Sequence, residues 1–259
     1  MTALVLDTLR ARRAGIVVVL VGLFGLSVMY LAIFPSLEEQ LQAFAGEIPE
    51  AVSAFVGDAD FATPAGYVRS QVYALTAPLL AAGVAIAVAN GLAKQERTVT
   101  LTPTYLAPVS RAQLALSHLA AGWGIALAAG IGVFAGVLIG APLAGAEVRV
   151  VDVLAATAPF VGFAWAASAV AWAVGCATGS PGAGTGAGWA FVAVSFLTNS
   201  IGELIDDVGF LTDVSPWGWY GAGSAVTDGF DPMSLLLFAL AFLLVPVGTT
   251  AFARRDLQL

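Results

Sequence analysis

The fold is decided by an uncharged block between Asp152 and Glu203, which reads VLAATAPFVGFAWAASAVAWAVGCATGSPGAGTGAGWAFVAVSFLTNSIG from Val153 to Gly202. One transmembrane helix needs about 20 apolar residues, so these 50 positions are too many for a single crossing. The Gly, Ser and Pro residues at 178–182 interrupt the block, as helix-breaking residues do. The block therefore predicts two membrane helices, near 154–177 and 184–204.

Working outward from this block, four further stretches are apolar and long enough to cross a bilayer. They predict membrane helices near 14–35, 72–93, 116–139 and 233–253. Pro78 falls in the first turns of the second stretch, where a membrane helix tolerates a kink. The expected fold is an all-α polytopic membrane protein with six transmembrane helices in one permease-like domain, 1–259.

The composition supports this interpretation, because 59% of the residues are hydrophobic and only 10% are charged. A soluble domain has roughly 45–50% apolar and about 25% charged residues, so most soluble enzyme folds are excluded. The net charge of −7 argues against a nucleic-acid partner, which would need clustered Lys and Arg. Cys176 is the one cysteine of the sequence and His118 is its one histidine. A Cys-based zinc site and a multi-His metal site are therefore excluded.

The basic residues orient the predicted helices. With the N-terminus inside, 8 of the 10 Lys and Arg residues lie in cytoplasmic segments, and only Arg69 and Arg149 lie outside, as the positive-inside rule requires. A five-helix topology would place Arg254 and Arg255 on the outer side. We therefore expect six crossings with the N- and C-termini cytoplasmic.

The acidic residues have the opposite distribution, since 14 of the 17 fall in the three outer segments. An acid-rich exterior with a single lysine indicates a halophilic source, and chance drift in a GC-rich genome remains the alternative. The first outer segment, 36–71, alternates apolar residues with Glu at helical spacing up to Val56, which predicts amphipathic interfacial helices. The last outer segment, 203–231, contains an aromatic group around Trp217.

No catalytic constellation is recognised in the sequence. A P-loop needs Gly before and Ser or Thr after its lysine, and Lys94 is flanked by Ala93 and Gln95. Ser117 and His118 are adjacent, so on a helix they point about 100° apart and do not face each other. We expect no enzyme activity and no cofactor in this chain, and His118 at the membrane interface.

Two features leave alternatives open. Asn199 and Glu203 are one helical turn apart at the outer end of the fifth helix, where they either line an outer vestibule or form a solvated helix end. Gly132 and Gly136 form a small-xxx-small pair, which marks either a dimer seam or close packing within the chain. No carboxylate lies at the centre of a predicted helix, which disfavours a secondary carrier without excluding it.

The inner segment 94–111 carries the most specific motif, KQERTVTLTPTYLAPVSR. It resembles the inner loop of the ABC-2 type permease family, the membrane subunits of ABC transporters whose ATPase is usually a separate chain. Thr100-Leu101 match the T-L of that family, Pro108 through Arg111 match its P-V-S-R, and Glu96 stands where an acidic residue is expected. Val99 and Pro103 depart from the pattern and leave the shape of the segment open. Four other short motifs resemble the family and occur in the same order along the chain: Phe34-Pro35, Pro64–Tyr67, Ser215–Trp217 and Phe252–Leu257.

The resemblance implies a multi-pass permease subunit of an ATP-driven transporter, an exporter, in a prokaryotic plasma membrane. It implies that ATP is bound by a partner ABC ATPase subunit, that 94–111 is the coupling segment, and that a second permease copy or a sibling completes the pore. Residues 178–181 would form a smaller inner contact, and 203–231 an outer re-entrant region. A non-translocating scaffold or sensor subunit is the alternative. The expected ATPase-coupling residues are Glu96, Arg97, Thr100, Tyr105, Pro108 and Arg111.

Overall fold

The computed structural model describes residues 2–45, 63–97 and 110–255, and these ranges form helices and connecting turns without β-strands. Five helical stretches are long and apolar enough to cross a membrane. They are Arg13–Leu41, Pro64–Ala89, Arg111–Ala144, Val150–Thr178 and Pro232–Arg254. The protein is therefore an all-helical, multi-pass membrane protein, as the sequence predicts at this level.

Helix α9 (Val150–Thr178) is the centre of the bundle and the most buried of the five spans. It packs against α5 (Thr76–Ala89), α8 (Arg111–Gly140), α10 (Pro181–Leu204) and α14 (Leu235–Arg254). Many of its buried side chains are alanine, which lets the neighbouring backbones approach closely. The core therefore depends on small residues more than on large apolar ones.

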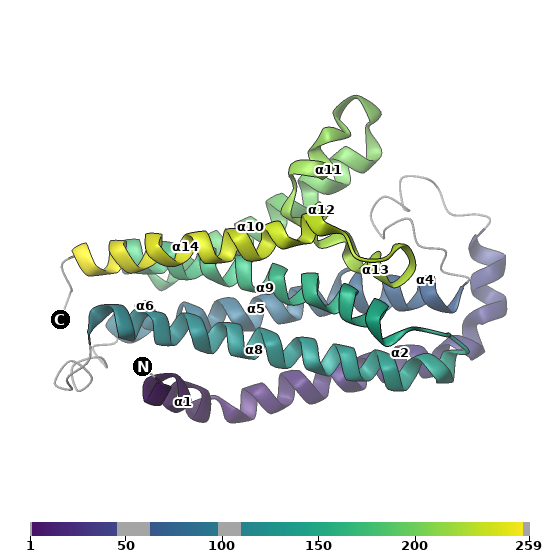
Figure 1. The fold of residues 1–259 in the computed structure, drawn as a ribbon, viewed down its shortest axis with the longest axis horizontal. Coiled ribbons are helices and arrows are strands. Elements are labelled where there is room, and N and C mark those ends of the chain that lie inside the picture. Colours follow the sequence, from purple (N-terminus) through teal and green to yellow (C-terminus); the bar gives the residue numbers. More distant parts are fainter. Residues whose placement is uncertain (1, 46–62, 98–109, 256–259) are drawn as a thin grey trace.

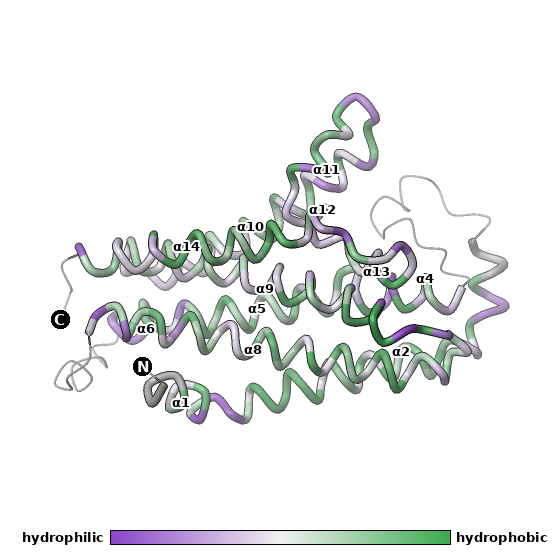
Figure 2. The backbone as a smooth tube through the Cα atoms, in the orientation of Figure 1, coloured by the Kyte–Doolittle hydropathy of each residue, from purple (hydrophilic) through white to green (hydrophobic). Residues whose placement is uncertain are grey.

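Both chain termini lie at the same end of this elongated bundle (Figure 1). The middle of the bundle is predominantly hydrophobic, and hydrophilic residues gather towards its ends and on the projecting α11 segment (Figure 2). We call the end with the termini the terminal end, and the other the distal end.

Helix α10 covers the expected fifth crossing and is 24 residues long, but it is not among the five most apolar spans. Its first turns contain several glycines and a threonine, and its last turns contain Asn199 and Glu203, all of which lower its mean hydropathy. The expected turn before it is present. Gly179 ends α9 with φ +67° in the left-handed region that glycine favours, and Ser180 caps α10 through its hydroxyl.

The first span differs from the expected 14–35. A short helix α1 (Thr2–Ala11) precedes it, and α2 runs from Arg13 to Ala45 without ending at Pro35. A proline inside a helix removes one hydrogen bond and bends the axis, and α2 turns away from the bundle towards its distal end (Figure 1). The first part of the expected interfacial segment 36–71 is thus a continuation of the membrane helix, and 46–62 lie outside the described residues.

The second span is broken rather than continuous. It consists of α4 (Pro64–Val68), a π-helical turn η1 (Arg69–Tyr73) and α5, with the helical geometry interrupted at Leu75. Pro78 has no N–H to donate to the carbonyl of Ala74, which accounts for a break one turn before it. Helix α6 (Gly91–Arg97) then continues to the terminal end. The span therefore begins before the expected 72–93.

Short helices connect α10 to α14 at the distal end. They are η3 (Asp206–Val208), α11 (Phe210–Val214), α12 (Pro216–Tyr220), η4 (Gly221–Gly223), α13 (Ala225–Asp228) and η5 (Pro232–Ser234). The Tyr220 hydroxyl donates a 2.6 Å hydrogen bond to the carbonyl of Tyr73, at the break in the second span. Burial, and secondarily the nearby Tyr73, raise the pKa of Tyr220 well above its usual value, so this hydroxyl remains a donor.

The glycine pair in α8 packs within the chain. A Cβ atom at Gly132 would lie 2.5 Å from the carbonyl oxygen of Leu20, and one at Gly136 would lie 2.7 Å from that of Phe24. A further turn made by η2 (Ala141–Ala144) extends the same α2 contact. Of the two alternatives for this pair, the structure supports close packing of α2 on α8.

Candidate functional site

The described residues that flank the expected coupling segment, in α6 and at the start of α8, lie at the terminal end. Of its predicted residues, Thr100, Tyr105 and Pro108 lie outside the described residues. Arg97 is the last residue of α6, and its side chain is also outside the description. Glu96 and Arg111 are the two that the structure places in detail, one on each side of 98–109.

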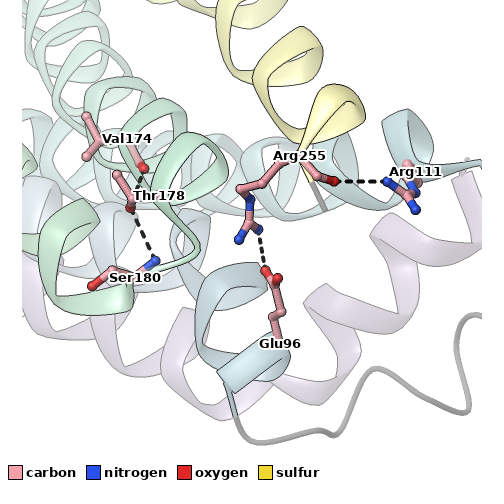
Figure 3. Close-up of polar contacts among 6 residues, drawn as sticks. All are labelled: Glu96, Arg111, Val174, Thr178, Ser180 and Arg255. Carbon is pink, nitrogen blue, oxygen red and sulfur yellow. Dashed lines mark hydrogen bonds and ion pairs between the residues drawn. The ribbon is translucent and has the colours of Figure 1, made fainter. Parts of the chain in front are cut away.

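Glu96 forms a buried ion pair with Arg255. The two side chains come from α6 and from the end of α14, and their closest atoms, Oε2 and Nη2, are 2.5 Å apart (Figure 3). The Glu96 side chain is 3% exposed and that of Arg255 is 18% exposed. The sequence places Glu96 among the ATPase-coupling residues, and this role stays a prediction; in the structure its carboxylate points into its own bundle, toward Arg255.

Arg255 also contacts the other side of the coupling segment. Its backbone carbonyl accepts a 3.2 Å hydrogen bond from Nη1 of Arg111, which begins α8 (Figure 3). Its guanidinium lies against Gly179, in the turn between α9 and α10. One residue near the chain end therefore joins α6, α8 and the α9–α10 turn.

A second polar side chain lies nearby in the same end of the bundle. Asn90, the C-cap of α5, donates to the carbonyl of Pro181 at 2.7 Å and to Thr185 Oγ1 at 3.0 Å. Its Oδ1, Glu96 Oε1 and Arg255 Nε are buried without a hydrogen-bond partner in the described ranges. A buried polar group without a partner costs about 1–3 kcal/mol, so this cluster is a costly arrangement in an otherwise apolar bundle.

We call Asn90, Glu96, Arg111 and Arg255 the terminal polar cluster. Sequence reasoning missed Asn90, and it used Arg255 as a marker of topology and as part of the Phe252–Leu257 motif of the family resemblance. Asn90 is the one amide inside an apolar stretch at 72–93, which is a signal that could have identified it. The pairing of Arg255 with Glu96 leaves no comparable trace, because the two are 159 positions apart.

His118, which is expected at the membrane interface, is buried inside the bundle at 3% exposure and does not reach toward solvent. Its ring lies against Gly91, where the Arg12 guanidinium also approaches. Ser117 donates its hydroxyl to the carbonyl of Leu114 at 2.7 Å, and His118 Nδ1 lies 3.2 Å from that same carbonyl. Ser117 and His118 are thus each bonded to the preceding turn, and they do not form a nucleophile–base pair.

Asn199 and Glu203 lie at the distal end, where both line a cavity of about 230 Å³. The Asn199 amide donates a 2.8 Å hydrogen bond to Glu203 Oε1. Asn199 is 7% exposed, whereas Glu203 is exposed. The cavity also contacts Arg69 in the second span and Trp217 in α12, so it brings together residues that are far apart in the sequence.

The geometry therefore comprises a polar cluster at one end of an apolar bundle and a cavity at the other. A search of curated proteins gave no match. A family model described as "Multidrug efflux system permease Rv1217c, C-terminal domain" matches residues 4–253, nearly the whole chain. The chain therefore belongs to this permease family, and it is a multi-pass transmembrane subunit of an efflux system.

Proposed function

We propose that this protein is the permease subunit of an ATP-driven ABC exporter of apolar or amphipathic compounds. A separate ABC ATPase docks on the 94–111 segment in the cytoplasm, and a second permease copy or a sibling completes the translocation path. The multidrug description of the matching family supports this substrate class. The resemblance of 94–111 to the ABC-2 coupling segment supports the choice of energy source.

In this proposal α10 is the sixth crossing. Its 24 residues extend about 36 Å at 1.5 Å per residue, enough for a hydrocarbon core of about 30 Å. Both termini lie at one end of the bundle (Figure 1), which requires an even number of passages. The terminal end is then cytoplasmic, in agreement with the positive-inside distribution of Lys and Arg.

The observation that carries the proposal is the attachment of both sides of the coupling segment to Arg255. Glu96 precedes the segment and binds the Arg255 side chain, while Arg111 follows it and binds the Arg255 carbonyl. A force applied to residues 98–109 by an ATPase would therefore reach α14 as well as α6 and α8. Rigid helices with a shared ionic contact are a physical route for such coupling.

The experiment is reconstitution of the affinity-tagged chain together with the ATPase that purifies with it. Inside-out proteoliposomes are given ATP, and uptake of a lipophilic dye is measured alongside phosphate release. We expect ATP-dependent uptake that is lost with Tyr105→Ala, because an aromatic anchor at a docking surface contributes disproportionately to binding. Residual ATP hydrolysis without uptake in this variant would indicate uncoupling.

The matched control is Tyr30→Ala, which truncates a tyrosine outside the coupling segment, in α2. This variant should keep the ATPase bound and retain its coupling. Dye transport that proceeds without any ATPase or nucleotide would overturn the proposed energy source. An intact complex that hydrolyses ATP but moves none of the dyes across the vesicle membrane would favour the scaffold alternative.

A further inference from the structure

The distal cavity lies where a membrane helix is broken. Arg69 in the π-helical turn and Ala74 at the interruption both line it. Irregular backbone at membrane depth is tolerated where protein buries it or where it lines a water-filled cavity, and π-helical turns are frequent at functional sites. The break and the cavity are therefore parts of one feature.

The walls of the cavity include aromatic rings that are already held in place. Phe196 and Trp217 pack edge to face, with ring centroids 5.1 Å apart. Trp219 donates its indole N–H to the carbonyl of Asp213 at 2.6 Å. All three residues line the cavity. Trp217 is only 4% exposed, so Trp219 is the aromatic residue whose ordering a ligand does not have to supply.

The charges that line the cavity are predominantly negative. Three acidic residues, Glu203, Asp213 and Asp231, line it together with one basic residue, Arg69. The Arg69 charge is already shared with Asp228, 3.9 Å away, which does not line the cavity. Acidic residues therefore outnumber basic residues three to one in the lining of the cavity.

Two of these carboxylates are oriented by their neighbours. The buried Asn199 amide holds Glu203, and the Asp231 Oδ1 accepts the backbone N–H of Met233 at 2.9 Å. The wall also contains Ala222, whose φ of +43° is the sole positive value for a non-glycine residue within the described ranges. Strained backbone of this kind concentrates at ligand sites and switch regions.

We propose that this cavity binds an organic cation with an aromatic or apolar body. The ammonium group lies among the three acidic residues, and the body lies against Trp219, where cation–π attraction adds to apolar contact. The inference rests on the proposed function in one respect: the distal end is the outer face, so the site receives the compound on its way out.

The test measures binding alone. The full chain in nanodiscs, without ATPase, is titrated with benzyltrimethylammonium and followed by saturation-transfer NMR, with empty nanodiscs subtracted. Neopentylbenzene is the neutral isostere of this cation, and phenylmethanesulfonate supplies an anion of similar size. We expect the cation to bind at least tenfold more tightly than either compound.

The variant pair is Glu203→Gln with Asp231→Asn, and its matched control is Asp206→Asn with Asp207→Asn. Asp206 and Asp207 are exposed, follow Glu203 by one turn and do not line the cavity. Removal of the two cavity carboxylates should weaken cation binding about tenfold, at roughly threefold for each partly solvated charge pair. The control should change it less than twofold.

Equal binding of cation and neutral isostere by the unmodified chain would overturn the proposal, and so would preferential binding of the sulfonate. Unchanged affinity in a correctly folded Glu203→Gln, Asp231→Asn variant would also overturn it. Because no nucleotide is present, a failure of the ATP-driven mechanism leaves these results unaffected. Intact ATP-driven dye transport together with absent cation binding would reject the site and leave the proposed function standing.

Discussion

The carboxylate of Glu96 and the guanidinium of Arg255 meet at 2.5 Å, although 159 positions separate them in the chain. Their contact joins the helix that enters the coupling segment to the final membrane helix. Because Glu96 is almost fully buried, its charge depends on Arg255 for compensation. This pair therefore attaches α6 to the end of α14 at the terminal end of the bundle.

Removal of one partner should therefore destabilise the protein strongly. Arg255→Gln leaves the Glu96 carboxylate buried without a cation, at a cost of about 3 kcal/mol, the lower end of the range for buried pairs because Arg255 retains some exposure. Unfolding in mixed micelles titrated with SDS measures this loss.

The control for that variant is Arg254→Gln, the exposed neighbour at the end of the same helix, which should shift stability by less than about 0.5 kcal/mol. The double variant Glu96→Gln, Arg255→Gln should recover part of the loss, because it leaves no unpaired charge. Equal losses for Arg254→Gln and Arg255→Gln would contradict this account of the pair.

Cys176 provides a native reporter of the same region. It is 3% exposed and packs in one apolar cluster with Phe252, and it is the single cysteine of the chain. We expect slow labelling by a polar maleimide in the unmodified protein. Labelling should accelerate at least tenfold in Arg255→Gln, because the end of α14 loses an ionic attachment.

The denatured chain is the reference for the labelling rate of Cys176. In it, the maleimide should react at the rate of a free thiol. Intact mass spectrometry over a time course follows the modification. Fast labelling of the unmodified, folded protein would show that the terminal end is open without any disturbance of the ion pair.

The contact between α2 and α8 should be intolerant of side chains at its glycines. Gly132→Ala places a methyl group against the Leu20 carbonyl. The backbone can make room for it only if α2 and α8 move apart, which lowers the stability of the fold by about 1–3 kcal/mol. Gly22→Ala on α2 is the matched control, because open space surrounds that position.

For Gly22→Ala we expect unchanged or slightly higher stability, since alanine is the better helix former by about 1 kcal/mol. Thermal melting in detergent, followed by fluorescence-detected size exclusion, compares the two variants. If the Gly132→Ala protein has the same melting temperature as the unmodified chain, α2 does not pack on α8 as described.

Tyr220→Phe should loosen the distal segment. The variant removes the hydroxyl that satisfies the Tyr73 carbonyl at the break in the second span, and a buried acceptor left without its donor costs about 1–3 kcal/mol. Hydrogen exchange of residues 216–224 should become faster. Thr227→Val deletes an exposed hydroxyl bonded to Ser224 in the same segment, and it should leave that exchange unchanged.

Several features could be predicted from the sequence because their signals are local. The turn at 178–182 is specified by its own glycines and proline, and α10 begins there as expected. Pro78 indicates a disturbance in the second span, although its extent, a π-helical turn and a full interruption, depends on packing against Tyr220. Pro35 gives a similar signal, and yet α2 continues to Ala45 because a bend suffices there.

The sequence by itself determined the membrane class, the approximate positions of the apolar helices and the family, since burial in lipid is dictated by hydropathy along consecutive residues. It could not determine which faces of those helices meet. Three features depend on the rotation and depth of each helix in the bundle. They are the Glu96–Arg255 ion pair, the packing of Gly132 against Leu20, and the cavity around Asn199. Only the tertiary structure decided them, because those variables follow from packing among all the helices at once.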